Sequence, residues 1–351
     1  MVTDESSAAL PLRPWLIEPV RAALASQHAH AIWLNGPPGV GQFDMALALA
    51  QAWLCEAEPV NAAPRTACGR CASCRLVHAR AHPDLMVLLP EALRESLGWN
   101  AGEDEEGGGS EGSSKRKPSK DIRVEEVRRI VSFAQTTAAR GRGKVVVVFP
   151  AERMNAISAN ALLKTLEEPP GELRFVLAGA SSDALLPTIR SRCQSLSLGV
   201  PDMRIAADWL ASQGVIQPEV LLAAAGGQPE EALAWSREGL DSKVWLALPG
   251  QLMRGEVGSL GSWPISRVVD VLFKVCHDAM RVAAGADPSY FIGSEPRFRG
   301  APDALARWYD ELSRLARHAE HPWQGALTVE WLVQQARFAL AAPAGARRSI
   351  N

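Results

Sequence analysis

The chain has 351 residues, a formal net charge of −2 and a hydrophobic content of 47%. This length suits two or three domains with a sizeable core, and the small net charge argues against nucleic-acid binding over the whole surface while leaving room for a local basic face. The acidic first ten residues argue against a secretory signal, and no uncharged apolar run approaches the about 20 residues of a membrane helix. We therefore expect a cytoplasmic protein whose six cysteines are reduced thiols or metal ligands.

A helix, a strand, a glycine-rich loop and a second helix are predicted near the N-terminus. Apolar residues at near-helical spacing place the first helix over residues 8–28, and a short apolar run places the strand over residues 30–34. The loop at 36–43 then leads into a helix over 44–55.

The glycine-rich loop has the spacing of a phosphate-binding loop. Gly36, Gly39 and Gly41 suit a backbone whose N–H groups, together with the following helix N-terminus, cradle an anion. Gln42 stands where a lysine would reach the terminal phosphates, and Phe43 stands where a hydroxyl would hold magnesium. We expect a degenerate loop from an NTPase fold that no longer hydrolyses nucleotide, and the alternative is an ordinary glycine- and proline-rich turn.

A cluster of cysteines follows the second helix. Three thiols lie on one tight stretch of the form Cys-x2-Cys-x2-Cys, and a fourth ends the helix before it. The four are Cys55, Cys68, Cys71 and Cys74. Four thiolates would close a tetrahedral structural zinc site. His78 or His82 in place of Cys55, free thiols and an iron–sulfur cluster are the weaker alternatives.

The composition changes sharply after the buried strand predicted at 85–89. Residues 98–120 combine an acidic, glycine-rich run with a serine-rich piece and a short basic tract. Such a segment buries too little apolar area to offset its ordering entropy, so we predict a disordered surface insertion. The zinc module is accordingly placed at about 55–84.

Strands and helices alternate through the next eighty residues. Helices are predicted at 122–138 and 159–168, and strands at 145–149, 174–178 and 195–198. A run of four valines in the first of these strands is typical of a central parallel strand, covered on both faces. The alternation predicts a three-layer α/β domain with a parallel sheet.

The valine-rich strand lacks the acidic pair of a working ATPase. Such a strand would end in Asp-Glu, which hold Mg²⁺ and activate water. Here it runs into Pro150, which cannot bind a metal, and Glu152 would have no nucleotide to serve. The sequence therefore departs from an active NTPase at three positions.

An exposed arginine is predicted after the 174–178 strand. Ser191-Arg192-Cys193 ends a loop from which Arg192 could reach a neighbouring subunit. Arginine suits such a role because it is always charged and forks onto phosphate oxygens. The simpler interpretation is an arginine in a surface salt bridge.

Strand signals vanish after residue 200. Short helices at 203–212 and 218–225 and another that starts near Pro229 suggest a helical lid over 201–238. Residues 239–342 are helical and rich in tryptophan, which favours a core or an oligomer interface over nucleotide stacking. We expect the tail, 343–351, to be frayed.

Four stretches together carry a resemblance to a known family. They are Leu34–Gly41, the four clustered cysteines, Asn160–Pro170 and Thr188–Cys193. The sequence resembles the delta prime family of bacterial DNA polymerase III clamp-loader subunits, within the AAA+ superfamily. The last two stretches are shared with the ATP-hydrolysing gamma/tau subunits, from which the broken loop and missing acidic pair distinguish this chain. The resemblance is strong over about residues 10–235, and the acidic insertion departs from the family pattern.

The resemblance implies a partner-dependent function. Family members join three gamma/tau motor subunits and a delta subunit in a five-subunit ring, which uses ATP to load the sliding clamp onto primed DNA within the DNA polymerase holoenzyme. A delta prime subunit holds no productive ATP and offers the arginine that matches Arg192, flanked by Ser191 and Cys193, to ATP on an adjacent motor subunit. The resemblance also implies an AAA+ core at 1–200, a lid at 201–238 and a ring-forming collar at 239–342.

We thus expect no intrinsic catalysis and no ATP of its own, a structural Zn²⁺, and a contribution in trans to the clamp-loader ATPase. Two rival functions remain. One is a gamma/tau-type ATPase motor subunit, which Gln42, Phe43 and Pro150 argue against. The other is a zinc-containing DNA-binding adaptor, which would bind DNA by itself in a salt-sensitive manner.

Overall fold

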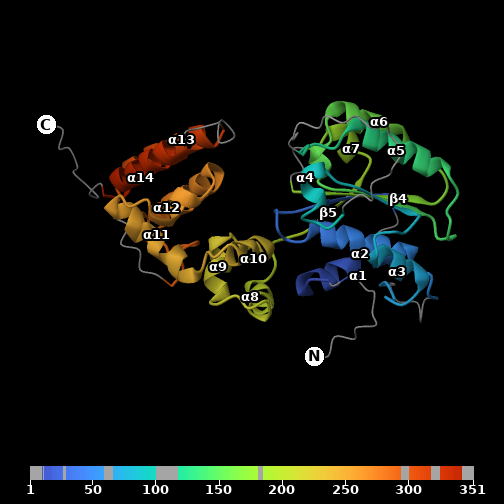
Figure 1. The fold of residues 1–351 in the computed structure, drawn as a ribbon, viewed down its shortest axis with the longest axis horizontal. Helices are drawn as coiled ribbons and strands as arrows, with labels where there is room; N and C mark the ends of the chain where they lie inside the picture. The colour runs from blue at the N-terminus through green and yellow to red at the C-terminus, as the bar shows by residue number, and fades with distance from the viewer. Residues whose placement is uncertain are drawn as a thin grey trace, which may run out of the picture. The chain divides into compact units, whose positions relative to one another are not determined.

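The computed structural model describes residues 10, 12–26, 29–58, 66–99, 118–180, 185–293, 300–317 and 325–341. The chain divides into two compact units, Met1–Pro201 and Asp202–Asn351 (Figure 1). Most of the predicted acidic insertion and the whole predicted tail lie outside the described residues.

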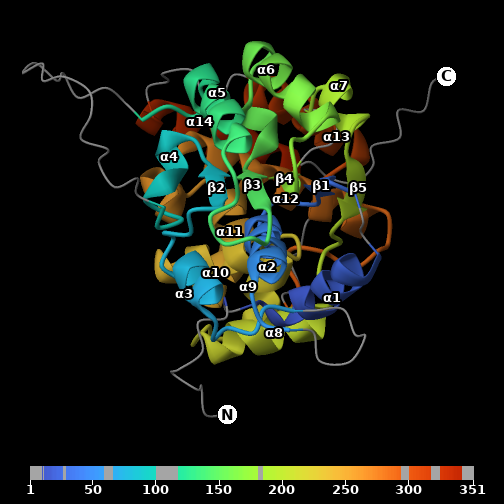
Figure 2. The ribbon, with the colours of Figure 1, turned by 90° about the vertical axis from the view of Figure 1, so that its right-hand side faces the viewer.

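Within the described residues, five parallel strands form the sheet of the first unit, in the order β2-β3-β4-β1-β5 (Figure 2). The strands are β1 (Ala31–Asn35), β2 (Leu85–Leu88), β3 (Lys144–Val148), β4 (Leu173–Gly179) and β5 (Gln194–Ser197). Every residue of β3 is buried, as expected of a strand covered on both faces. The predicted parallel α/β fold is confirmed, whereas the strand order, with β1 between β4 and β5, was not predicted.

Helices cover both faces of this sheet (Figures 1 and 2). One face carries η1 (Pro14–Leu16), α1 (Ile17–Ser26), α2 (Gln42–Leu54) and α3 (Ala72–His78). The other carries α5 (Val124–Gln135), α6 (Ala156–Glu167) and α7 (Pro187–Arg190), and the short elements α4 (Glu91–Arg94) and η2 (Ala151–Arg153) lie in connections. Alternate residues of β3 enter opposite cores, Val145 and Val147 on the α2 side and Val146 and Val148 on the α6 side.

The first helix starts later than predicted. A single 3₁₀ turn starts at Pro14, and the α-helix is Ile17–Ser26, while the predicted end at 27–28 lies outside the described residues. Proline is tolerated in the first turn of a helix but not further inside, because it lacks an N–H and its ring clashes with the preceding turn. Arg13, just before the turn, is accordingly extended.

The second unit is helical in its described residues. Its helices are α8 (Met203–Ser212), α9 (Pro218–Ala224), α10 (Pro229–Arg237), α11 (Ser242–Arg254), η3 (Gly258–Ser262), α12 (Ile265–Ala283), α13 (Pro302–Ala316) and α14 (Gly325–Ala341). One hydrophobic cluster reaches from Ala206 to Leu340. The division of this unit into a lid and a collar stays a prediction.

Aromatic side chains make up much of that core. Trp245 stacks on Phe291 with ring centroids 4.6 Å apart and on Trp235 at 5.6 Å. Asp278, fully buried, accepts hydrogen bonds from the backbone N–H groups of Ser289, Tyr290 and Phe291, which fixes the segment carrying Phe291.

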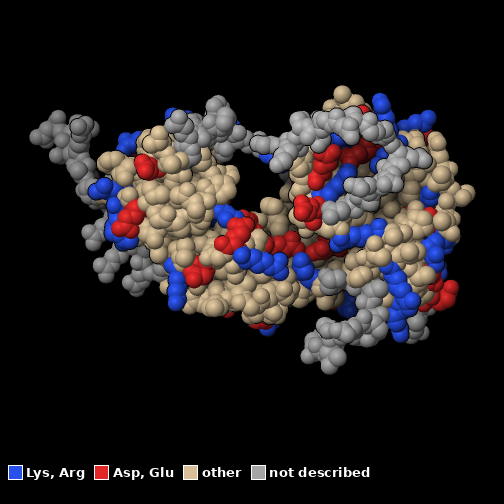
Figure 3. Space-filling model, viewed as in Figure 1, with Lys and Arg blue, Asp and Glu red and all other residues tan. Residues whose placement is uncertain are grey.

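Groups of positively and of negatively charged side chains both lie on the face seen in Figure 3. None of the helices in the described part of the chain combines the length and the apolar character needed to cross a bilayer.

Candidate functional site

The glycine-rich loop joins β1 to α2 and depends on its glycines. A Cβ at Gly36 would lie 2.5 Å from the carbonyl oxygen of Leu198. Gly41 has φ +96°, and a Cβ there would lie 2.8 Å from Cδ1 of Leu16. The loop backbone is therefore packed closely from two directions, which only glycine permits.

Gln42 turns back onto this loop instead of facing outward. Its side chain is 4% exposed, and its Nε2 donates to the carbonyl oxygens of Gly36, at 2.7 Å, and Pro37, at 2.6 Å. Trp15 Nε1 donates to the carbonyl oxygen of Val40 at 2.8 Å. The side chain at the position of the phosphate-binding lysine thus fastens the loop to itself.

The Phe43 side chain is buried and packs against other aromatic rings. It is 7% exposed, and its ring centroid lies 5.2 Å from that of Phe149 and 6.4 Å from that of Trp99. An aromatic cluster therefore occupies the position from which a Ser or Thr hydroxyl would bind magnesium.

Glu152 faces the end of β4. Its Oε1 accepts a hydrogen bond from the N–H of Ala180 at 2.8 Å, and its Oε2 is buried without a hydrogen-bond partner among the described residues. A Cβ at Gly179 would collide with this carboxylate and would lie 2.8 Å from the buried Trp33 ring, so a larger residue there would displace one of the two. Pro150, as the sequence indicates, offers no metal-binding side chain.

The four predicted cysteines come together. The sulfurs of Cys55, Cys68, Cys71 and Cys74 all lie within 4.8 Å of one another, with Cys68–Cys74 and Cys55–Cys71 separations of 3.9 Å. Zinc–sulfur bonds of about 2.3 Å in a tetrahedron correspond to sulfur–sulfur separations of about 3.8 Å. The cluster could therefore hold a metal ion, and its size and all-thiol donor set fit zinc.

Backbone N–H groups surround these sulfurs. The N–H of Cys71 donates to Cys68 Sγ at 3.3 Å, and that of Cys74 donates to Cys71 Sγ at 3.3 Å. Burial works to raise the pKa of the Cys68 thiol, but donation from the N–H groups of Arg70 and Cys71 lowers it to about 6. Burial raises the pKa of Cys74.

A network of polar side chains, which the sequence analysis did not identify, lies beside the cysteine cluster. Ser73 Oγ donates to Glu56 Oε1 at 3.0 Å, and Arg140 Nε donates to the same oxygen at 2.6 Å, which lowers the pKa of Glu56. His82 Nε2 lies 3.0 Å from Ser73 Oγ, while its Nδ1 accepts from the N–H of Asp84. Both ring nitrogens of His82 are thus engaged away from the sulfurs, and Cys55 is the residue beside the other three.

Arg192 lies just after α7, at the surface. Its Nη1 donates to the carbonyl oxygen of Thr188 at 2.7 Å, and both Nε and Nη2 contact Oε1 of Glu167 at the end of α6. Its side chain is 34% exposed. Of the flanking residues, Ser191 is exposed, and burial raises the pKa of Cys193 to about 12.

The structure places Arg192 and the glycine-rich loop at opposite ends of two adjacent strands, β5 and β1. The loop follows the carboxyl end of β1, whereas Arg192 precedes the amino end of β5, and the two strands run parallel with Ile32 opposite Gln194. At least four residues of strand, about 13 Å, separate the two levels. Within the described residues, the Arg192 guanidinium contacts Glu167, Thr188 and Ser191 and none of the loop residues.

Residues 16–202 match the model of the family described as "DNA polymerase III, delta subunit". This match covers more than half of the chain. The chain belongs to this family. A delta' subunit of DNA polymerase III from Pseudomonas aeruginosa is 38% identical over 58% of this chain and 55% of its own length. The corresponding protein of Yersinia pestis is 33% identical over 74% of this chain and 76% of its own.

This chain thus spans little more than half the length of the Pseudomonas family member. A solved structure of a DNA polymerase III gamma subunit-related protein from Thermotoga maritima has 16% identity and a TM-score of 0.46, covering 92% of this chain and 98% of its own.

Proposed function

We propose that this chain is the non-hydrolysing delta' subunit of a DNA polymerase III clamp loader, with an AAA+ core. It acts in the cytoplasm beside gamma/tau-type motor subunits and a delta subunit in a five-subunit ring, and it supports ATP-dependent loading of the sliding clamp onto primed DNA. Its catalytic contribution is Arg192, lent to ATP held by a neighbouring motor subunit.

One observation carries this proposal. Arg192 lies at the surface before the amino end of β5, whereas the glycine-rich loop follows the carboxyl end of the adjacent β1, so a second molecule that displaced Glu167 would meet the guanidinium away from this chain's own loop. A planar, permanently charged fork stabilises the negative charge that develops on the γ-phosphate during transfer to water.

The side chains of the glycine-rich loop also support a subunit that does not hydrolyse ATP itself. Gln42 hydrogen-bonds the loop carbonyls, and Phe43 is packed against Phe149. A nucleotide would find neither a free ammonium group nor a metal-binding hydroxyl here. The chain therefore acts as a stationary member of the ring.

We further infer that the four clustered cysteines hold a structural Zn²⁺. Zinc would supply folding energy by tying the end of α2 to α3, since thiolates close all four tetrahedral positions and leave none for catalysis. This role agrees with the burial of Cys55 and Cys74.

The last helix supports the predicted ring contact. Leu327, Trp331 and Phe338 of α14 follow the spacing of one helical face and are 62%, 46% and 72% exposed. Exposed apolar side chains in a row, two of them aromatic here, are typical of protein–protein interfaces. We propose that this face contacts the neighbouring subunit of the ring.

The test is reconstitution. The chain is mixed with candidate motor and delta subunits, the assembly is weighed by native mass spectrometry, and its ATPase is measured with and without Arg192→Ala. We expect a mixed assembly whose ATPase depends on Arg192. Turnover of Mg-ATP by this chain alone would overturn the proposal in favour of a motor subunit, and salt-sensitive DNA binding by the lone chain would favour the adaptor.

A further inference from the structure

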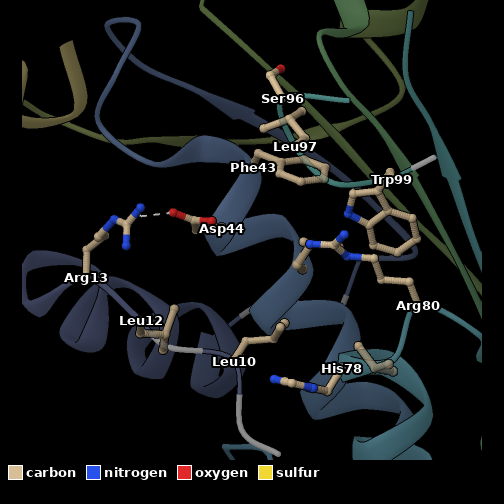
Figure 4. Close-up of a pocket in the computed structure, with 12 residues that line it drawn as sticks. Leu10, Leu12, Arg13, Phe43, Asp44, His78, Arg80, Ser96, Leu97 and Trp99 are labelled. Atoms are coloured by element: carbon tan, nitrogen blue, oxygen red, sulfur yellow. Dashed lines mark ion pairs between the residues drawn. The ribbon is translucent and has the colours of Figure 1, made fainter. Parts of the chain in front are cut away.

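A cavity of about 420 Å³ opens beside Phe43, within the first unit (Figure 4). Its walls come from four segments: the stretch before η1, the start of α2, the end of α3 and the stretch after α4. Ligand pockets in proteins commonly occupy about 300–1,000 Å³. Phe43, the last residue of the glycine-rich loop, is in its wall, and Arg192 is not.

More than half of the cavity wall is apolar, and His78 and Ser96 are among its polar residues. Phe43 and Trp99 meet at an interplanar angle of 80°, and Leu47, Val77 and Leu97 extend the carbon surface. The side chain that deprives the loop of a metal-binding hydroxyl therefore also lines this cavity.

Arg80 supplies a positive charge at the cavity, from a residue whose backbone has an unusual conformation. Its φ of +59° is left-handed, which is uncommon for any residue but glycine. Its guanidinium carbon lies 5.6 Å from the centre of the Trp99 ring. Gly98 lies directly beside it, since a Cβ at that position would collide with the guanidinium.

The charge around the cavity is positive. Arg13 lies across the cavity from Arg80, with its Nε 3.6 Å from Oδ2 of Asp44 (Figure 4). Among the described residues that line the cavity, Asp44 is the one acid, so two guanidiniums face one carboxylate.

We propose that this cavity is a docking site for a partner protein's peptide segment that combines acidic residues with one or two bulky apolar side chains. The apolar side chains are buried against Phe43 and Leu47, and the carboxylates pair with Arg80 at the rim. Charge-assisted hydrogen bonds to arginine give such contacts geometric specificity as well as affinity.

A peptide fits these observations better than nucleic acid does. Single-stranded nucleic acid is held by aromatic rings whose faces are open to successive bases, together with a basic groove. Trp99 is already engaged by Arg80 and Phe43, and Asp44 would repel a phosphate backbone.

The cysteine cluster is connected to one wall of this cavity. Gln51, which is 2% exposed, accepts a hydrogen bond from the N–H of Leu10 at 3.2 Å and donates one to the carbonyl oxygen of Cys74 at 3.1 Å. It thereby fastens two walls of the cavity to α2. Because Cys74 belongs to the cluster, the cluster positions the α3 wall.

The experiment is a titration of the full-length chain with the fluorescein-labelled peptide Asp-Asp-Leu-Phe-Asp-Leu-Asp, followed by fluorescence anisotropy. We expect a dissociation constant of about 1–100 μM. Arg80→Glu should weaken binding by about tenfold or more. Arg75→Glu, with the same charge change at an exposed position of α3 outside the cavity, should stay within about twofold.

A second variant and a second peptide keep the test decisive if Arg80→Glu fails to fold. Leu97→Ser should also weaken binding about tenfold because it removes apolar surface from the wall, and a peptide with Ser in place of Leu and Phe should not bind. Equal losses in Arg75→Glu and Arg80→Glu, equal binding of the Ser peptide, tighter binding of oligo(dT), or no saturation at roughly 1 mM peptide would each overturn the proposal. None of these outcomes bears on Arg192.

Discussion

The glycine-rich loop and the Arg192 turn belong to one sheet but use their polar side chains in opposite ways. At the loop, Gln42 bends inward and hydrogen-bonds the carbonyls of Gly36 and Pro37. At the turn, the Arg192 guanidinium stays at the surface, held by Glu167 and Thr188. A glycine-rich backbone with phosphate-loop spacing is therefore combined here with side chains used for packing, while a charged guanidinium lies at the surface near the other end of the adjacent strand.

The largest expected effect comes from Arg192→Ala in the reconstituted loader. The chain should fold normally because the side chain lies at the surface, and the ATPase should fall by about tenfold to a thousandfold. Steady-state ATPase of the assembled ring is the measurement. Arg190→Ala, two residues earlier and also exposed, is the matched control. An unchanged rate for Arg192→Ala would remove this residue from catalysis.

Cys71→Ser tests whether the four-cysteine cluster holds a stabilising zinc ion. We expect the loss of about one zinc per chain and of roughly 4 kcal/mol of unfolding free energy, since structural zinc binding is folding free energy. Metal analysis and denaturant unfolding measure the two quantities. Cys193→Ser, outside the cluster, should leave the zinc content unchanged. A parent protein that contains no zinc would end the assignment.

The double change Gln42→Lys and Phe43→Thr tests whether restoring the lysine and the hydroxyl of a phosphate-binding loop is enough to restore ATP hydrolysis. We expect a destabilisation of about 3 kcal/mol, because removing the Phe43 ring leaves a cavity against Phe149 and Trp99. We also expect no ATP turnover by the isolated chain, because Pro150 still replaces a metal-binding acid. Calorimetric unfolding measures the loss of stability, and an ATPase assay measures turnover. Measurable turnover would show that the loop side chains alone prevent hydrolysis in the parent chain.

A smaller effect is expected from pH. Burial lowers the pKa of His82 below 6.5, against the opposing influence of Asp84, with further contributions from Arg140 and Glu56. The unfolded chain therefore binds the proton first as the pH falls below about 6.5, and stability is lost through that window by up to about 1 kcal/mol. Urea unfolding at several pH values measures the slope.

His82→Asn is the control for that slope. Its amide oxygen can still accept from the N–H of Asp84, but it does not titrate. The variant should flatten the pH dependence between about pH 7 and 5.5. A slope identical to that of the parent, at equal zinc content, would exclude His82 as its source.

The smallest expected effect is that of Glu167→Gln. In the free chain Glu167 engages two nitrogens of Arg192, so phosphate oxygens must displace it. Removing its charge should raise the ATPase of the assembled ring by about twofold, or leave it unchanged, since an exposed ion pair contributes little. A loss as large as that of Arg192→Ala would show instead that Glu167 orients the arginine.

Several features could be predicted because their signals are local in the sequence. Alternation of apolar runs and turn residues located β1, β3 and β4, and the spacing of the cysteines predicted that their sulfurs lie together. The last three cysteines of the cluster do not share one loop as predicted, because Cys71 is the N-cap of α3 and Cys74 lies within that helix. The degenerate loop was readable because phosphate binding needs particular residue types at adjacent positions. Helix boundaries were less accurate, as at α1, where proline decided the start.

The features that only the tertiary structure decided join residues far apart in the chain. Pairing of β1 with β4 and β5 separates Arg192 from the loop, and no local pattern specifies which strands pair. The same holds for the contact of Arg140 with Glu56, and for the cavity between Arg80, Trp99 and Phe43. Local propensity depends on neighbouring residues, whereas these arrangements result from burial of whole faces, which is settled only when every element packs at once.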